Sequence, residues 1–154
     1  MASSIPRVDP DRFKRERFRF FTPVSSRWGD CDMFGHVNNV RFLSYYETAR
    51  LDYFEKVLQQ GIGPNPKEAL IVADIHINYL KQMHHPCQFE VATRIGRLGN
   101  SSFDVEAAIF AVSDSSQYSV VRVGCVWFDY RANRSIRIPD SARQTIQQFE
   151  ETNL

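Results

Sequence analysis

The sequence lacks the features that mark several classes of protein. Its three cysteines (Cys31, Cys87 and Cys125) are odd in number and form no C-x-x-C pair. This argues against a disulfide framework or a cysteine-based zinc site and suits a reducing compartment. The longest uninterrupted apolar run covers residues 107–112, which is too short to cross a bilayer. No apolar segment follows the first methionine, so we expect no secretory signal and a cytoplasmic location.

An excess of charge of either sign is also absent. Nineteen basic side chains face eighteen acidic ones, for a net charge of +1, so nucleic acid and anionic membrane surfaces are not expected as partners. Hydrophobic residues make up 43% of the 154 residues, which is typical of one soluble globular domain with a real core. Aromatic residues reach 13%, with twelve Phe, which indicates large side chains in a core or an interface.

The chain divides into an arm, one domain and a tail. Residues 1–16 are charged, contain Pro10 and show no periodicity, so we expect a flexible N-terminal arm. Alternation from Arg17 predicts the first strand, and a proline at position 23 puts its later half at an edge or a bend. The single domain is expected over residues 17–150, with 151–154 as a tail.

A long helix is predicted from Asn39 to about Gln60. Apolar residues occupy most of its circumference, so the helix should be largely buried. Gly61 follows it in the usual place for a left-handed cap.

Four alternating segments follow, and they predict strands. They cover residues 71–79, 89–95, 103–109 and 118–130. Because turns are short between them, we expect an antiparallel meander, with the last strand central because both of its faces are apolar. A short final helix begins near residues 139–141, with Asp140 as its cap. Together these elements predict an α+β fold, in which a curved antiparallel sheet wraps around one long central helix.

Polar residues gather in the turn that leads into the long helix. They are Asp30, Asp32, Gly35, His36, Asn38 and Asn39. Unpaired backbone N–H groups and the helix dipole favour negative charge at a helix N-terminus, which suits an oxyanion. A nearby carboxylate can serve as base or nucleophile. Capping is the commoner role of Asp and Asn before a helix, so the residues alone leave both interpretations open.

The segment W-G-D-C-D-M-F-G-H-V-N-N (28–39), followed by Y-Y-E-T-A-R (45–50), resembles the hotdog-fold thioesterases of the 4-hydroxybenzoyl-CoA thioesterase type. Both motifs occur in the family's order and spacing, and the resemblance covers roughly residues 17–150. It implies a hotdog fold and an acyl-CoA thioesterase that hydrolyses a thioester to a free acid and coenzyme A.

The resemblance also assigns roles to individual residues. Asp32 matches the catalytic carboxylate, which attacks the thioester carbonyl or activates water for that attack. Asn39 matches the first helical turn, whose backbone N–H polarises the carbonyl. Substrate-site roles go to Gly35, which allows the close turn, to His36 beside the acyl pocket, and to Asn38, which holds the loop. Asp30 is interpreted as structural.

The family usually forms dimers or tetramers with sites at the subunit interface, so the resemblance implies a homo-oligomer whose second subunit lines each site. It implies no metal and no redox cofactor. Coenzyme A carries phosphates, so cations are expected near the pocket. Candidates are Lys81, Arg94, Arg97 and Arg122.

Several alternatives stay open. The thioester could belong to an acyl-carrier protein, and the N-terminal arm is locally basic enough to meet such an acidic partner. A hotdog hydratase or dehydratase would pair His36 with a carboxylate. A non-catalytic acyl-CoA-binding module would keep the fold without turnover. The spacing of Asp30, Cys31, Asp32 and His36 matches no standard zinc pattern, and His84 and His85 are interpreted as exposed loop histidines.

Overall fold

The computed structural model describes residues 8–60 and 67–151. Its elements are η1 (Pro10–Phe13), η2 (Arg15–Arg17), β1 (Phe20–Ser25), η3 (Trp28–Asp30), α1 (Asn39–Lys56), β2 (Glu68–Tyr79), β3 (Gln88–Leu98), β4 (Ser102–Ala111), β5 (Gln117–Asp129), β6 (Arg134–Ser135) and α2 (Asp140–Glu150). Among the described residues, no helix is both long enough and apolar enough to cross a bilayer. The expected cap at Gly61 lies outside them.

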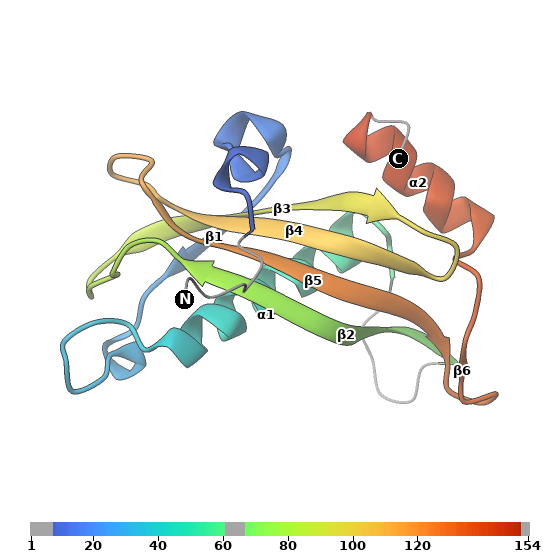
Figure 1. Cartoon of the computed structure of the whole chain (residues 1–154), viewed down its shortest axis with the longest axis horizontal. Coiled ribbons are helices and arrows are strands. Elements are labelled where there is room, and N and C mark those ends of the chain that lie inside the picture. The colour runs from blue at the N-terminus through green and yellow to red at the C-terminus, as the bar shows by residue number, and fades with distance from the viewer. Residues whose placement is uncertain (1–7, 61–66, 152–154) are drawn as a thin grey trace, which may run out of the picture.

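The strands form one antiparallel sheet in the order β1-β3-β4-β5-β2, with β6 paired to the end of β5. The sheet curves and α1 lies against one side of it (Figure 1). The predicted α+β hotdog architecture is confirmed. The strand expected to be central, β5, is an interior strand, since it pairs with both β4 and β2, and β4 is the middle strand of the order.

The predicted meander is correct for β3, β4 and β5 but wrong for β2. Strand β2 pairs with β5 and not with β3, the next strand in the sequence. One edge of β3 pairs with β4 and the other with β1. The reason is the connection formed by residues 80–87. It has no hairpin turn and carries the chain from β2, at one edge of the sheet, to β3, which lies next to the edge strand β1. On the way it passes the segment before α1, where the Met83 carbonyl accepts the Val37 N–H.

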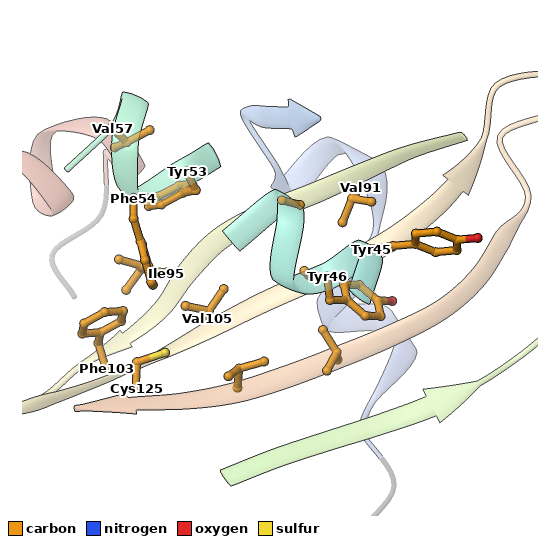
Figure 2. Close-up of a cluster of buried hydrophobic side chains, with 14 of the residues drawn as sticks. Tyr45, Tyr46, Tyr53, Phe54, Val57, Val91, Ile95, Phe103, Val105 and Cys125 are labelled. Atoms are coloured by element: carbon orange, nitrogen blue, oxygen red, sulfur yellow. The ribbon is translucent and has the colours of Figure 1, made fainter. Parts of the chain in front are cut away.

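Strand alternation gives the sheet an inner face and an outer face. The inner face carries Phe103 and Val105 of β4 among many buried apolar side chains, and these pack against Ala49, Tyr53 and Phe54 of α1. Figure 2 shows this cluster, in which the rings of Phe54 and Phe103 meet edge to face at 5.9 Å. Burying each large apolar side chain stabilises the fold by roughly 1.5–3 kcal/mol, so the inner core is what holds α1 on the sheet.

Helix α1 starts at the predicted residue and ends earlier than predicted. Its last residue is Lys56 rather than Gln60. The chain leaves the helix because Gln59 adopts a left-handed conformation, with φ of 52°. The Gln60 N–H then bonds the Phe54 carbonyl at 3.0 Å, which closes the helix end without glycine.

The prediction of a flexible arm does not describe residues 8–16. Phe13 is 1% exposed and packs with Phe18 on the outer face of the sheet, over Ala92, Ala108 and Phe110. Small alanines on that face leave an apolar surface that would otherwise meet water, and this segment covers it. Hydrophobic periodicity does not predict this packing against the sheet, because η1 and η2 are too short to contain a repeating pattern.

Charged side chains add to this attachment. Arg12 pairs with Glu106 at 2.6 Å and Arg15 with Glu90 at 2.5 Å. The strand expected from Arg17 begins only at Phe20, because Arg15–Arg17 form the 3-10 turn η2.

Helix α2 lies beside β3 at one end of the sheet (Figure 1). Its N-cap is Pro139, which has no capping side chain, so the predicted cap at Asp140 is wrong. Asp140 is the first helical residue, and its carboxylate accepts a hydrogen bond from Arg137 at 2.9 Å. Near the other end, Glu150 accepts hydrogen bonds from the Tyr53 hydroxyl at 2.5 Å and the Ile95 N–H at 3.0 Å.

Candidate functional site

The motif loop folds into a compact turn between η3 and α1. Cys31 and Val37 form an isolated bridge across its base. Within it, the Asp32 N–H bonds the His36 carbonyl at 2.9 Å, and the Gly35 N–H bonds the Asp32 carbonyl at 3.1 Å. Gly35 has φ of 80°, a left-handed conformation that glycine adopts at little cost. The loop therefore holds Asp32 and His36 side by side.

Asp30 anchors the base of this loop. Its side chain is 2% exposed and accepts hydrogen bonds from the Tyr45 hydroxyl at 2.6 Å and from the backbone and guanidinium of Arg27 at 2.9 and 3.1 Å. Its carbonyl accepts from the Asn38 N–H at 2.8 Å. Burial alone would raise the pKa of Asp30, but the hydrogen bonds from Tyr45 and Arg27 outweigh it and hold the pKa below 3.8. The structural interpretation of Asp30 is confirmed.

Asp32 lies in a different environment, only two residues away. Its carboxylate is partly open to solvent, and Oδ1 accepts a hydrogen bond from the Phe34 N–H at 2.9 Å. The same oxygen lies 3.9 Å from Nδ1 of His36. The second oxygen, Oδ2, has no hydrogen-bond partner among the described residues. Asp32 therefore has one oxygen fixed by the loop and one available to another molecule.

The first turn of α1 presents an open donor. The side chain of Asn38 caps the helix by accepting the Val40 N–H at 3.0 Å, and its carbonyl accepts the Arg41 N–H at 2.9 Å. The N–H of Asn39 has no partner within residues 8–60 and 67–151. An unpaired N–H at the positive end of the helix dipole is a site for a developing negative charge.

A cleft of about 250 Å³ opens beside this donor. It is lined by His36, Val37, Asn39, Phe42, Tyr79, Leu80, Lys81, Gln82 and Met83. The Tyr79 hydroxyl donates a hydrogen bond to the Asn39 carbonyl at 3.1 Å. The Tyr79 ring meets Phe42 edge to face at 5.3 Å. Asp32 does not line the cleft directly but adjoins it through His36.

The structure thus brings together all five residues that the sequence singled out for the site. Asp32, Gly35 and His36 share one turn, and Asn38 and Asn39 begin the helix next to it. Their assigned roles in catalysis and substrate binding remain predictions.

The four candidate cations are divided. Lys81 lines the cleft. Arg94, Arg97 and Arg122 instead pair with carboxylates of the sheet, at 2.6, 2.9 and 2.6 Å. Lys81 also lies 3.9 Å from Asp114 and donates a hydrogen bond to Ser116 at 3.1 Å, but it is the one of these four candidates that lines the cleft.

Sequence reasoning missed two neighbours of the site, Tyr79 and His84. Both come from the end of β2 and the connection after it, far from the motif in sequence. Nδ1 of His84 lies 3.0 Å from the Gly35 carbonyl. The spacing of residues in the sequence could not have predicted this proximity. Residues 80–87 pass beside the segment before α1 because β2 pairs with β5, and that pairing is a property of the fold.

The cysteines and the possible metal ligands add little chemistry. Cys31 packs against the inner core. Burial raises the pKa of Cys125 to about 12, so its thiol stays protonated. In the part of the chain that the structure describes, no three His, Cys, Asp or Glu side chains gather as metal ligands.

Comparison with known proteins identifies the family. Residues 26–146 match the model of the Thioesterase-like superfamily. The chain is 34% identical over 85 residues to the uncharacterized protein YsmA of Bacillus subtilis, covering 55% of this chain and 56% of YsmA. It is 26% identical over 125 residues to the acyl-acyl carrier protein thioesterase ATL2 of Arabidopsis thaliana, covering 79% of this chain and 64% of that protein. The chain therefore spans less than two thirds of these curated relatives.

Among solved structures, a thioesterase of Thermus thermophilus, crystallised with coenzyme A and Zn, is 29% identical and superposes with a TM-score of 0.77. That match covers 90% of this chain and 99% of the other. The narrower 4-hydroxybenzoyl-CoA thioesterase type stays a prediction. Since the family model covers most of the sequence, the chain belongs to the Thioesterase-like superfamily.

Proposed function

We propose that this protein hydrolyses acyl thioesters, with Asp32 as the reacting carboxylate and the Asn39 N–H as the oxyanion donor. The observation that carries the proposal is the N–H of Asn39, which has no partner in the part of the chain that the structure describes and belongs to a residue that lines the cleft next to the loop of Asp32. His36 lines the same cleft and lies 3.9 Å from Asp32. A carboxylate beside a preorganised N–H is the minimum that acyl transfer requires.

The reaction begins when the thioester carbonyl oxygen accepts the Asn39 N–H, which makes the carbonyl carbon more electrophilic. In one route, a carboxylate oxygen of Asp32 attacks that carbon, the thiolate leaves and takes a proton, and water hydrolyses the resulting anhydride. In the other route, Asp32 takes a proton from water, the hydroxide attacks, and the proton passes to the leaving thiolate. Both routes give a free acid and a thiol, and both use the oxygen Oδ2 that the loop leaves free.

Coenzyme A thioesters are the proposed substrates. The Thermus relative binds coenzyme A in its crystal, and Lys81 offers a cation at the cleft for a phosphate. The side chains of Phe42, Leu80 and Met83 supply an apolar lining for the acyl group. ATL2 acts on carrier-protein thioesters, so an acyl-carrier-protein thioester is the alternative substrate.

We propose further that two copies pair through the edge strand β2 and complete each other's site. Val72 and Ile75 on this strand are 40% and 43% exposed, and Met33 and Phe34 at the loop tip are 100% and 83% exposed. Large exposed apolar side chains on a long unpaired edge favour pairing with another copy.

The proposal is tested by free-thiol release from short, long and aromatic acyl-CoAs. Turnover of at least one of them supports it, and the best substrate reports the shape of the acyl pocket. Hydration of an enoyl-CoA without thiol release would favour the hydratase alternative. Binding without any turnover, on coenzyme A or carrier-protein thioesters, would leave a non-catalytic module and contradict the proposal.

A further inference from the structure

The connection between β2 and β3 touches the loop that carries Asp32. Nδ1 of His84 lies 3.0 Å from the carbonyl oxygen of Gly35. A carbonyl only accepts hydrogen bonds, so Nδ1 carries the proton and donates it. This contact joins two segments that are 49 residues apart.

Two further contacts accompany this hydrogen bond. The Met83 carbonyl accepts the Val37 N–H at 2.8 Å. The ring of His84 meets the ring of His36 edge to face, with centroids 5.4 Å apart. Residues 83 and 84 therefore hold the loop on both sides of His36.

The connection is itself fixed to the chain before the loop. The buried Ser26 hydroxyl lies 2.9 Å from Nδ1 of His85 and accepts the Cys87 N–H at 2.9 Å. The Ser26 N–H donates to the Cys87 carbonyl at 2.8 Å. Because both ends of the contact are anchored, His84 acts from a fixed base.

We propose that His84 is a positioning residue for thioester hydrolysis, an inference that rests on the proposed function. Its hydrogen bond fixes the Gly35 peptide. In the sequence, Gly35 is separated from Asp32 by Met33 and Phe34 and directly precedes His36. The tip of this loop is fully exposed at Met33, so the loop depends on its internal hydrogen bonds and on contacts from residues 83 and 84. Positioning matters because a shift of about 1 Å in a reacting group can lower the rate about a hundredfold.

Three substitutions separate the hydrogen bond from the ring contact. H84A removes both. H84N keeps a donor, because the amide nitrogen of Asn takes the place of Nδ1. H84F keeps a ring and removes the donor. Thr145 on α2 supplies the matched control, T145A, because its hydroxyl also donates to a backbone carbonyl, that of Ser141 at 3.0 Å, away from the loop and from β2.

The four variants and the wild type are compared for kcat and KM on the best acyl-CoA and for thermal unfolding midpoints. For H84A and H84F we expect kcat to fall about tenfold or more, with KM within about threefold, because ground-state binding is kept while alignment is lost. H84N should recover kcat to within about threefold of the wild type, and T145A should match the wild type. Unfolding midpoints should differ little among all five proteins.

Wild-type kcat in H84A would overturn the inference, and the proposed function would stand. The inference would also be overturned if H84A lost kcat and H84N did not restore it, because the effect would then belong to the ring. It would be overturned as well if the loss of kcat matched a fall in the unfolding midpoint, because His84 would then be merely structural. An inactive wild type would instead overturn the proposed function, and the inference with it.

Discussion

At the scale of single residues, Asp30 and Asp32 differ because of what surrounds them. Asp30 is buried among donors from Arg27 and Tyr45, so its hydrogen-bonding capacity is used to shape the loop. Asp32 has one oxygen, Oδ2, that bonds no other group among the described residues. Both residues are Asp in a turn before a helix, so the sequence separates their expected roles only through the family resemblance. Their side-chain partners become visible only in the fold.

Asp30 gives a prediction on stability and pH. Its folded pKa is lowered, so the stability it contributes is present above pH 3.8 and is lost as pH falls through the folded pKa. D30N should lower the free energy of unfolding at pH 7 by about 1–3 kcal/mol, because it leaves buried donors unpaired. Urea unfolding at pH 7 and at about pH 3 measures this. A difference between D30N and wild type that does not shrink at the lower pH would contradict it.

At the scale of elements, the sequence predicted those that are set by local patterns. The start of α1 at Asn39, the alternating faces of β3 and β4, and the interior place of β5 follow from hydrophobic periodicity. The pairing of β2 with β5 could not be predicted, because register patterns do not say which edge a strand joins. The N-terminal segment was missed for a related reason. Phe13 and Phe18 are placed by a surface on distant strands rather than by a repeat of their own.

The N-cap of α1 is predicted to contribute both to stability and to turnover. N38A removes the acceptor for the Val40 N–H and should cost about 1 kcal/mol. It should also lower kcat, because the first turn that presents the Asn39 N–H loosens. N38D, which keeps a capping oxygen, is the control. Chemical unfolding and thiol release measure the two effects, and N38A with unchanged stability would count against the cap.

The docking of α2 is predicted to weaken as pH rises. Burial raises the pKa of Glu150 above 4.5, and hydrogen bonds from Tyr53 and Ile95 only partly offset this. A raised pKa means that the stabilising protonated form is present below pH 4.5 and is lost as pH rises through the folded pKa. E150Q keeps an acceptor without the charge, so its stability relative to wild type should increase from about pH 4.5 to about pH 8. A constant difference across that range would refute this assignment.

At the scale of the whole molecule, one side of the sheet is covered by α1 and part of the other by residues 8–18, while the edge strand β2 and the motif loop leave apolar side chains in water. These exposed groups lie on the elements that form or border the cleft. The oligomer and the site are therefore linked in this account, because pairing at β2 would enclose a cleft that is open in one copy.

The proposed pairing predicts a particle of twice the chain mass by light scattering at micromolar concentration. I75K places a charge on the edge strand β2, at a side chain that is 43% exposed, and should shift the protein toward monomer and reduce thiol release, because charges on an edge strand oppose pairing. K81A leaves β2 unchanged and should stay dimeric. A wild-type monomer with full activity would rule out the shared site.

In the proposed function Asp32 is the reacting carboxylate, and this role is tested most directly by comparing kcat in wild type, D32N and D129N. Asp129 is the matched control, because its carboxylate also accepts N–H groups of the following turn, at 2.8 and 2.9 Å, at the far end of β5. We expect D32N to lower kcat at least about a hundredfold, D129N to leave it unchanged, and all three proteins to unfold at similar temperatures. A D32N protein that retains wild-type turnover, or that loses activity only in proportion to its stability, would contradict the account.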